Sequence, residues 1–158
     1  MNAITGLVCR RATRADLTRL VELLADDELG RDRDAAGADD PAYEQAYAAI
    51  EADRNQLLLV GELQATVIAM LQLTFIPGLS RRGAWRANIE SVRVASNLRS
   101  RGIGAWLIQR ALLQAQERGC RMAQLTSDKR RIEAHRFYGR LGFAASHEGF
   151  KLALGAHT

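Results

Sequence analysis

The stretch that decides the fold runs from Ile89 to Ala105 and reads IESVRVASNLRSRGIGA. Its first six residues, 89–94, are rich in β-branched side chains and predict a strand. Residues 97–101 are polar and predict a turn. Apolar residues then recur at the spacing of an amphipathic helix, at Ile103, Leu107, Ile108, Ala111, Leu112 and Ala115.

The junction between this strand and helix carries the pattern Arg-x-x-Gly-x-Gly, from Arg99 to Gly104. Glycines let a ligand approach the backbone closely. The first N–H groups of a helix lack an intrahelical partner, and the helix dipole adds positive charge, so an anion such as pyrophosphate can bind there. Arg99 and Arg101 would add two cations. The alternative is a tight turn with two exposed arginines, and the chain lacks both the P-loop ending and a complete dinucleotide pattern.

Length and composition predict one domain over residues 1–158, because 158 residues with 47% hydrophobic and 25% charged residues can build a core of their own. No apolar run reaches the length of a membrane span. Residues 1–6 do not resemble a signal peptide, so we expect a cytoplasmic protein that does not bind membranes.

Charge and cysteine content narrow the class further. The net charge of +4 would suit a nucleic-acid binder, but only 6% of residues are aromatic and none interleave with the arginines, so we expect no nucleic-acid partner. Cys9 and Cys120 are far apart in sequence and are predicted to be free thiols. The three histidines form no metal-binding spacing with them, so we expect no metal.

Hydrophobic periodicity predicts the element order βααβββαβαββ in an α/β fold. Thr13 to Asp16 resembles a capping box at the start of the first helix. A polar loop is predicted over 26–40. The expected strands are 7–12, 57–63, 66–75, 85–94, 122–127 and a final pair at 143–146 and 150–154. One helix is expected to begin at 17 and another at 41. A long helix is expected to follow the glycine turn and end near 118, and a short one to cover 134–141.

Three motifs, taken in order, resemble the GNAT superfamily of acyl-CoA-dependent N-acyltransferases. The first is the strand with Val92 and Val94 followed by the Arg99–Gly104 turn. The second is Leu-Thr-Ser at 125–127, at the place of the family's fifth strand. The third is AHRFYGRLGF at 134–143, similar to the family's Ala-x-x-Phe/Leu-Tyr-x-x-Leu-Gly-Phe. The resemblance covers nearly the whole chain.

The resemblance implies a central mixed, mostly antiparallel sheet that is splayed between its fourth and fifth strands and flanked by about four helices. Acetyl-CoA, the implied co-substrate, would lie in the opening, its pantetheine against Val92 and Val94 and its pyrophosphate against the N–H groups of 101–105. Many members carry Asn where this chain has Arg131, which would instead meet a phosphate or face water. The implied acetyl-CoA-binding residues are Val92, Arg93, Val94, Arg99, Ser100, Arg101, Gly102, Ile103, Gly104, Ala105, Thr126, Lys129 and Arg131.

Acetyl transfer to an amine needs a proton acceptor, a donor to the thioester oxygen and a proton for the thiolate. Glu90 is the candidate base, acting through a water, because we expect it in a buried strand where low polarity raises a carboxyl pKa. The alternative is an ion pair with Arg93 or another arginine. The resemblance places the hydroxyl of Tyr138 near the sulfur as the acid, whereas the residues alone favour a core tyrosine, on one apolar stripe with Phe137 and Leu141.

The predicted function is therefore direct acetyl transfer from acetyl-CoA to a primary amine, without a covalent enzyme intermediate. A CoA-binding regulatory or interaction module without turnover is the alternative, since a fold alone does not give function. The acceptor and the oligomeric state stay open, although a homodimer is common in the family. An acidic early loop with Glu28, Asp32 and Asp34 suggests a cationic amine or a lysine side chain, and a small molecule, a peptide N-terminus and a protein lysine all stay open as acceptors.

Overall fold

The computed structural model describes residues 5–26, 31 and 37–155. By its internal contacts the chain divides into two compact units, Met1–Leu125 and Thr126–Thr158. The expectation of one domain over 1–158 stays a prediction.

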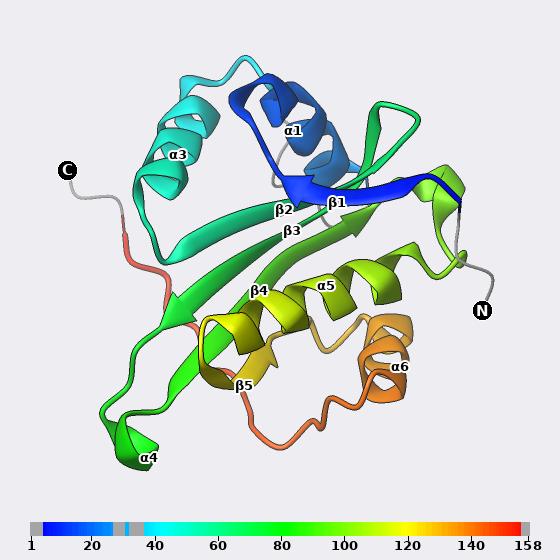
Figure 1. Cartoon of the computed structure of the whole chain (residues 1–158). Coiled ribbons are helices and arrows are strands. Elements are labelled where there is room, and N and C mark those ends of the chain that lie inside the picture. Colours follow the sequence, from blue (N-terminus) through cyan, green and yellow to red (C-terminus); the bar gives the residue numbers. More distant parts are fainter. Residues whose placement is uncertain (1–4, 27–30, 32–36, 156–158) are drawn as a thin grey trace. The chain divides into compact units, whose positions relative to one another are not determined.

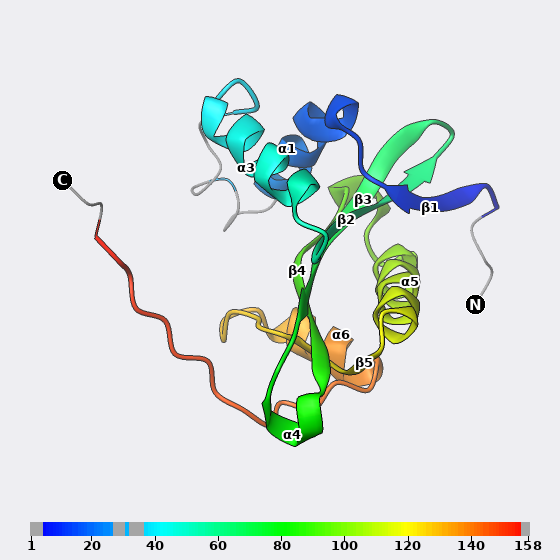
Figure 2. The same ribbon diagram turned by 60° about the vertical axis from the view of Figure 1, so that its left-hand side comes forward.

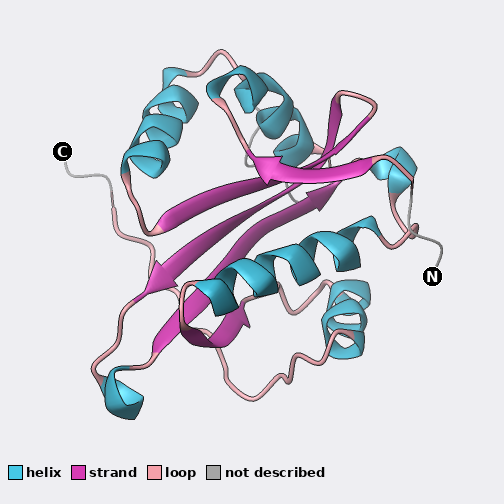
Figure 3. Ribbon diagram, viewed as in Figure 1, coloured by secondary structure: helices cyan, strands magenta, loops and turns pink. Residues whose placement is uncertain are grey.

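The first unit is built on one five-stranded sheet (Figures 1 and 3). Its strands follow chain order in space, and all neighbours are antiparallel except the last pair, which is parallel. The predicted mixed, mostly antiparallel sheet is thus confirmed. The strands are β1 Leu7–Arg11, β2 Gln56–Leu63, β3 Thr66–Ile76, β4 Trp85–Val94 and β5 Cys120–Leu125.

Helices cover both faces of this sheet (Figure 2). Helices α1 (Leu17–Ala25) and α3 (Pro41–Ala52) lie on one face, and α5 (Ile103–Glu117) lies on the other. Asp40 caps α3, its carboxylate accepting the N–H of Ala42 at 2.9 Å. Among the described residues the unit also contains three short elements: the turns η1 (Arg14–Asp16) and η2 (Ser96–Leu98) and the helix α4 (Ser80–Gly83).

The core lies where apolar helix and strand faces meet. On the α1–α3 side, Leu20, Leu23 and Tyr47 form one cluster with Val60 and Met70. On the other side, the predicted stripe of α5 is buried except for the half-buried Leu112, and this helix contacts the four strands β2 to β5. Hydrophobic burial on both faces therefore stabilises the sheet between helix layers.

An ion pair joins β1 to the beginning of α1. The guanidinium of Arg10 donates to both carboxylate oxygens of Asp16, at 2.7 and 2.9 Å. The same carboxylate accepts the N–H of Thr13 at 2.7 Å, so the predicted capping box is confirmed. These donors favour the ionised form and lower the pKa of Asp16 to about 2.

The second unit contains α6 (Ile132–Arg140). The ring of Tyr138 packs within it, 5.2 Å from the ring of Phe137 and 6.0 Å from that of Phe143 between centroids. The strand pair predicted at 143–146 and 150–154 is wrong, because residues 143–155 form no strand. Phe150, Leu152 and Leu154 alternate as in a strand, yet they are 92%, 86% and 87% exposed. Alternation alone does not form a strand, since a strand also needs a hydrogen-bonding neighbour.

Two further sequence predictions concern loops and membranes. Most of the predicted loop over 26–40 lies outside the described residues, including Glu28, Asp32 and Asp34. In the ranges that the structure describes, none of the helices combines the length and the apolar character that crossing a membrane requires.

Candidate functional site

Strand β4 continues past the end of β5 and leaves an open edge. The two strands pair from Trp85 opposite Cys120 to Ile89 opposite Leu125, where β5 ends. Residues 90–94 of β4 still pair with β3 but have no strand on their other side within the described residues. The N–H of Ala95 donates to Ile68 of β3 at 2.8 Å. Since successive residues of a strand point their polar groups to opposite sides, Val94 directs its own toward the open edge.

A β-bulge interrupts β4 at the same place. Gln72 of β3 lies opposite Glu90 and Met70 lies opposite Arg93, so Ser91 and Val92 together face a single β3 residue. Ser91 takes a left-handed backbone conformation, with φ 53°. A bulge re-aims the side chains that follow it, so Glu90 and Arg93 come to the same face of the sheet although they are three residues apart.

The N-terminus of α5 follows two left-handed residues, Ser100 at φ 62° and Gly102 at φ 82°. The first helical hydrogen bond runs from the N–H of Trp106 to the carbonyl of Gly102 at 3.0 Å. The N–H groups of Ile103, Gly104 and Ala105 precede it and have no acceptor within the helix. The predicted glycine turn and helix start are confirmed, and their exposed donors and dipole suit an anion.

Arg99 is engaged with the protein itself. Its Nε donates to the carbonyl of Val94 at 3.1 Å, and its Nη2 donates to the carbonyl of Asp26, at the end of α1, at 2.5 Å. The carboxylate of Asp26 accepts the N–H of Ser96 at 2.7 Å. Arg99 therefore links the turn to the end of β4 and to the end of α1 by hydrogen bonds. Its predicted contact with acetyl-CoA stays a prediction.

Arg101 differs from Arg99. Its side chain is exposed and forms neither an ion pair nor a hydrogen bond with any residue that the structure describes. It lies beside the free N–H groups at the start of α5, so it is the cation of this turn that an anionic ligand can engage without breaking a contact.

Glu90 lies at the open edge but does not have the environment expected for it. The expectation of a buried side chain is wrong, because Glu90 is exposed. The helices on its face pack over Val60, Met70 and Arg93, and Glu90 lies one row further out. It forms no ion pair with Arg93 or with any other described residue, so the alternative interpretation finds no support there. Its role as base stays a prediction.

Arg93 is buried, with 9% of its surface exposed. Its Nη1 donates to the carbonyl of Val92 at 3.0 Å. The side chain therefore lies within the protein on the α1–α3 face, and by the same alternation its backbone polar groups point toward β3. A contact of Arg93 with acetyl-CoA also stays a prediction.

The remaining predicted residues belong to the second unit. Thr126 and Lys129 are exposed, Arg131 precedes α6, and Tyr138 is half-buried within α6. The neighbouring Asp128 forms an ion pair with Arg130 at 2.8 Å, and its backbone carbonyl lies 2.9 Å from Nε2 of His135. The predicted roles of these four residues rest on the resemblance to the family and stay predictions.

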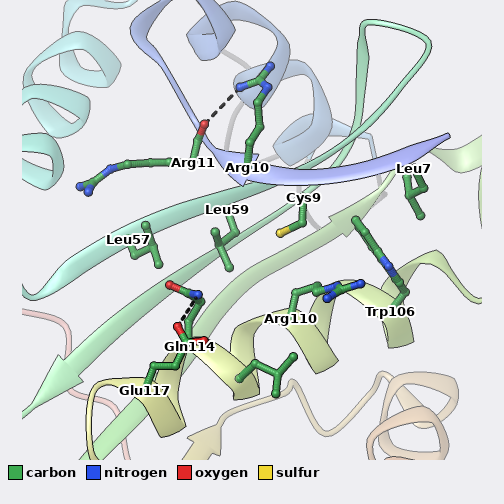
Figure 4. A pocket seen from close by; sticks show the side chains of 11 residues that line it. Leu7, Cys9, Arg10, Arg11, Leu57, Leu59, Trp106, Arg110, Gln114 and Glu117 are labelled. Atoms are coloured by element: carbon green, nitrogen blue, oxygen red, sulfur yellow. Dashed lines mark hydrogen bonds between the residues drawn. The ribbon is translucent and has the colours of Figure 1, made fainter.

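A separate cavity of about 650 Å³ lies between β1, β2 and α5 (Figure 4). None of the predicted site residues lines it. Cys9 points from β1 toward α5 and is its one thiol. Burial raises the pKa of Cys9, with Arg110 acting weakly against it, and burial likewise raises the pKa of Cys120. A raised pKa disfavours the thiolate, so neither cysteine has the character of a nucleophile.

The comparisons with known proteins identify the class. The family model described as "Acetyltransferase (GNAT) family" matches residues 17–143. The chain belongs to this family and is an acetyltransferase by class. The family generally uses acetyl-CoA as co-substrate, and the open β4 edge with the free N–H groups of α5 fits that ligand.

Individual relatives agree on the fold and differ in their described roles. An aminoalkylphosphonate N-acetyltransferase from Salmonella typhimurium is 29% identical over 113 residues, covering 72% of this chain and 73% of the relative. A transcriptional regulator from Bacillus halodurans C-125 is 45% identical with a TM-score of 0.89, covering 94% of this chain and 99% of that one. A Trypanosoma brucei acetyltransferase, 24% identical with a TM-score of 0.75 over 94% and 99% of the two chains, shares the fold.

Two features of the site were not predicted from the sequence. The bulge at Ser91 has no residue signal, since Glu-Ser-Val reads as ordinary strand. The hydrogen bond between Arg99 and Asp26 joins residues 73 positions apart, which spacing alone cannot indicate. The alternation of polar and apolar residues in β3, Leu-Gln-Leu-Thr-Phe over 71–75, is a signal in the sequence from which no site residue was predicted.

Proposed function

We propose that this protein transfers the acetyl group of acetyl-CoA directly to a primary amine. The observation that carries the proposal is the open β4 edge, which ends at a helix start with three N–H groups lacking helical acceptors. The open edge can pair with an extended amide-containing chain, and the helix start can bind a pyrophosphate. Pantetheine and pyrophosphate are joined in this order in acetyl-CoA, which supplies the thioester.

In the proposed reaction the amine nitrogen forms a bond to the acetyl carbon, and the carbon–sulfur bond breaks. Glu90 accepts the amine proton through a water, and its exposure leaves room for that water. The backbone N–H of Val92 donates to the thioester oxygen as negative charge develops there. Tyr138, assigned by its family motif alone, gives a proton to the departing thiolate.

The properties of the two cysteines support a direct transfer. A covalent route would need an activated nucleophile. Burial raises the pKa of both Cys9 and Cys120, which opposes such a role. The proposed reaction therefore uses no acetylated cysteine.

The test is thiol release from acetyl-CoA with a panel of primary amines, with the acetylated product identified by mass. Amine-dependent release together with a product heavier by one acetyl group is the expected result. Release that equals the amine-free blank for every amine, in protein that binds acetyl-CoA, would contradict the proposal.

The 45% identity to a protein described as a transcriptional regulator favours one alternative, a CoA-binding regulatory module without turnover. This alternative predicts that acetyl-CoA binds and stabilises the protein while thiol release stays at the blank. The same assay therefore separates the two functions. The name of the Salmonella relative makes 2-aminoethylphosphonate a required member of the amine panel.

A further inference from the structure

One face of the sheet changes character along its strands. On the α1–α3 face, pairing places Val60, Met70 and Arg93 in one transverse row. All three are buried beneath the helices. The next row outward is Leu58, Gln72 and Glu90, in which burial falls from Leu58 to the exposed Glu90.

The following row is polar across four strands. It contains Gln56 of β2, Thr74 of β3, Asn88 of β4 and Gln124 of β5, each opposite its neighbour. Gln56, Thr74 and Asn88 are half-exposed and Gln124 is exposed. Together with Gln72 these four residues are called the polar strip.

The opposite face of the same strands stays apolar. Leu71, Leu73 and Phe75 of β3 and Ala87 and Ile89 of β4 alternate with the polar residues, and all five are buried. The polar strip is therefore confined to one face, and it begins where the cover of α1 and α3 ends.

Side chains of the strip are already ordered by one another. Gln72 Nε2 donates to Gln56 Oε1 at 2.9 Å, and the hydroxyl of Thr74 donates to the same oxygen at 3.0 Å. Gln124 Nε2 donates to Asn88 Oδ1 at 3.4 Å. Amides and a hydroxyl held in this way present both donors and acceptors in fixed positions.

The geometry points to an acceptor that is a primary amine bearing neutral hydroxyl or amide groups, recognised by the polar strip. This inference rests on the proposed function and names its substrate class. The carboxylate of Glu90 attracts the ammonium form. Asn88 lies two residues away along β4, about 7 Å at the rise of a strand, so a group one small ring away from the nitrogen reaches the strip.

The charges along β4 argue against a short anionic amine. Arg93 is buried, and the next arginine outward along β4 is Arg86, four residues from Glu90. That separation is about 13 Å. An anion two carbons from its amine would therefore meet neutral amides, whereas hydroxyl or amide groups would find partners. An amine with only a hydrocarbon body would cover the polar strip and leave its amide and hydroxyl groups without hydrogen-bond partners.

The experiment compares matched amines that differ in their hydroxyl groups. The pairs are glucosamine with cyclohexylamine and 2-amino-1,3-propanediol with isopropylamine, with 2-aminoethylphosphonate as the anionic arm. Values of kcat/KM are corrected for the neutral fraction of each amine. We expect the hydroxylated member of each pair to exceed its hydrocarbon partner by about tenfold or more.

Two near-isosteric variants test the strip itself. Thr74→Val and Asn88→Leu should each lower the ratio within a pair by about threefold to tenfold, the effect of one lost hydrogen bond. Thr66→Val, at the exposed start of β3, is the matched control and should leave the ratio unchanged. Stabilisation by acetyl-CoA in all three variants shows that the fold and co-substrate binding persist.

Three results would each overturn the inference. The first is a wild-type ratio of kcat/KM within a pair of one or less, and the second is a ratio that is unchanged in both strip variants. The third is a preference for 2-aminoethylphosphonate. Thiol release with hydrocarbon amines would at the same time leave the proposed function intact. If no amine supports release, the proposed function fails. Amine binding then decides the inference, measured as the rise in melting temperature that an amine causes in the presence of CoA. A rise with the hydroxylated amines that is lost in Thr74→Val upholds the inference. No rise with these amines overturns it.

Discussion

Arg99 and Arg101 are separated by one residue, and their side chains lie in different environments. Arg99 donates hydrogen bonds to two backbone carbonyls, those of Val94 and Asp26, at 3.1 and 2.5 Å. Arg101 has no partner among the described residues. Replacing each by Gln removes the charge while keeping a polar side chain.

The magnitude for Arg99→Gln follows from its contacts. A hydrogen bond from a charged group contributes about 1.5–3 kcal/mol when buried. The side chain is 44% exposed, and its ion pair with Asp26 spans 3.8 Å. Solvent screening reduces the total for both bonds to about 1–2 kcal/mol. For a chain of this size the melting temperature of the ligand-free protein should then fall by about 2–8 °C.

Arg101→Gln should leave that melting temperature nearly unchanged, because exposed side chains without contacts contribute little. Its effect should appear in acetyl-CoA affinity, as a weakening of about fivefold that shrinks at high salt. The assays are thermal melting without ligand and calorimetric titration with acetyl-CoA at two salt concentrations. The reasoning is refuted if Arg99→Gln melts like the wild type, or if Arg101→Gln destabilises the ligand-free protein as much as Arg99→Gln does.

Three further substitutions test other parts of the account. Glu90→Gln should slow transfer mainly below the pKa of the amine while sparing acetyl-CoA affinity; an unchanged pH–rate profile argues against the base. Gly102→Val should prevent acetyl-CoA binding in calorimetry yet leave the protein folded, since no atom lies within 4 Å of an added Cβ and the left-handed φ costs about 1–2 kcal/mol; retained affinity would refute the pyrophosphate turn. Asp16→Asn should lower the unfolding free energy at pH 7 by about 2 kcal/mol, because the lowered pKa stabilises the fold above the unfolded pKa of 3.8 and loses that effect as pH falls toward about 2. Denaturant titrations from pH 2 to 7 check this, and wild-type and variant curves that stay parallel would contradict it.

Much of the fold could be predicted because local patterns and tertiary structure agree. The apolar stripe of α5, the capping box at Asp16 and the glycine turn at Gly102 each satisfy a local rule that the structure obeys. The strands 143–146 and 150–154 could not be decided in this way, because a strand depends on a neighbour that its own residues do not specify.

The site was less predictable for the same reason. The exposure of Glu90 depends on where α1 and α3 end over the sheet, and the apolar residues around it in β4 gave no sign of that boundary. The task of Arg99 depends on Asp26, which the turn motif does not include. The polar strip was visible as alternating residues in β3, but its width appears only when the register aligns four strands.

We propose that acetyl-CoA binds along the open β4 edge and the start of α5. Thermal melting of the wild type and of Gly102→Val, each with acetyl-CoA and with ATP, tests this binding site. At a hundredfold excess over Kd the wild type should gain about 2.7 kcal/mol, a rise of about 5–11 °C. ATP should raise it little, and Gly102→Val should not respond. An equal rise in Gly102→Val, or no rise with acetyl-CoA in the wild type, would contradict the claim.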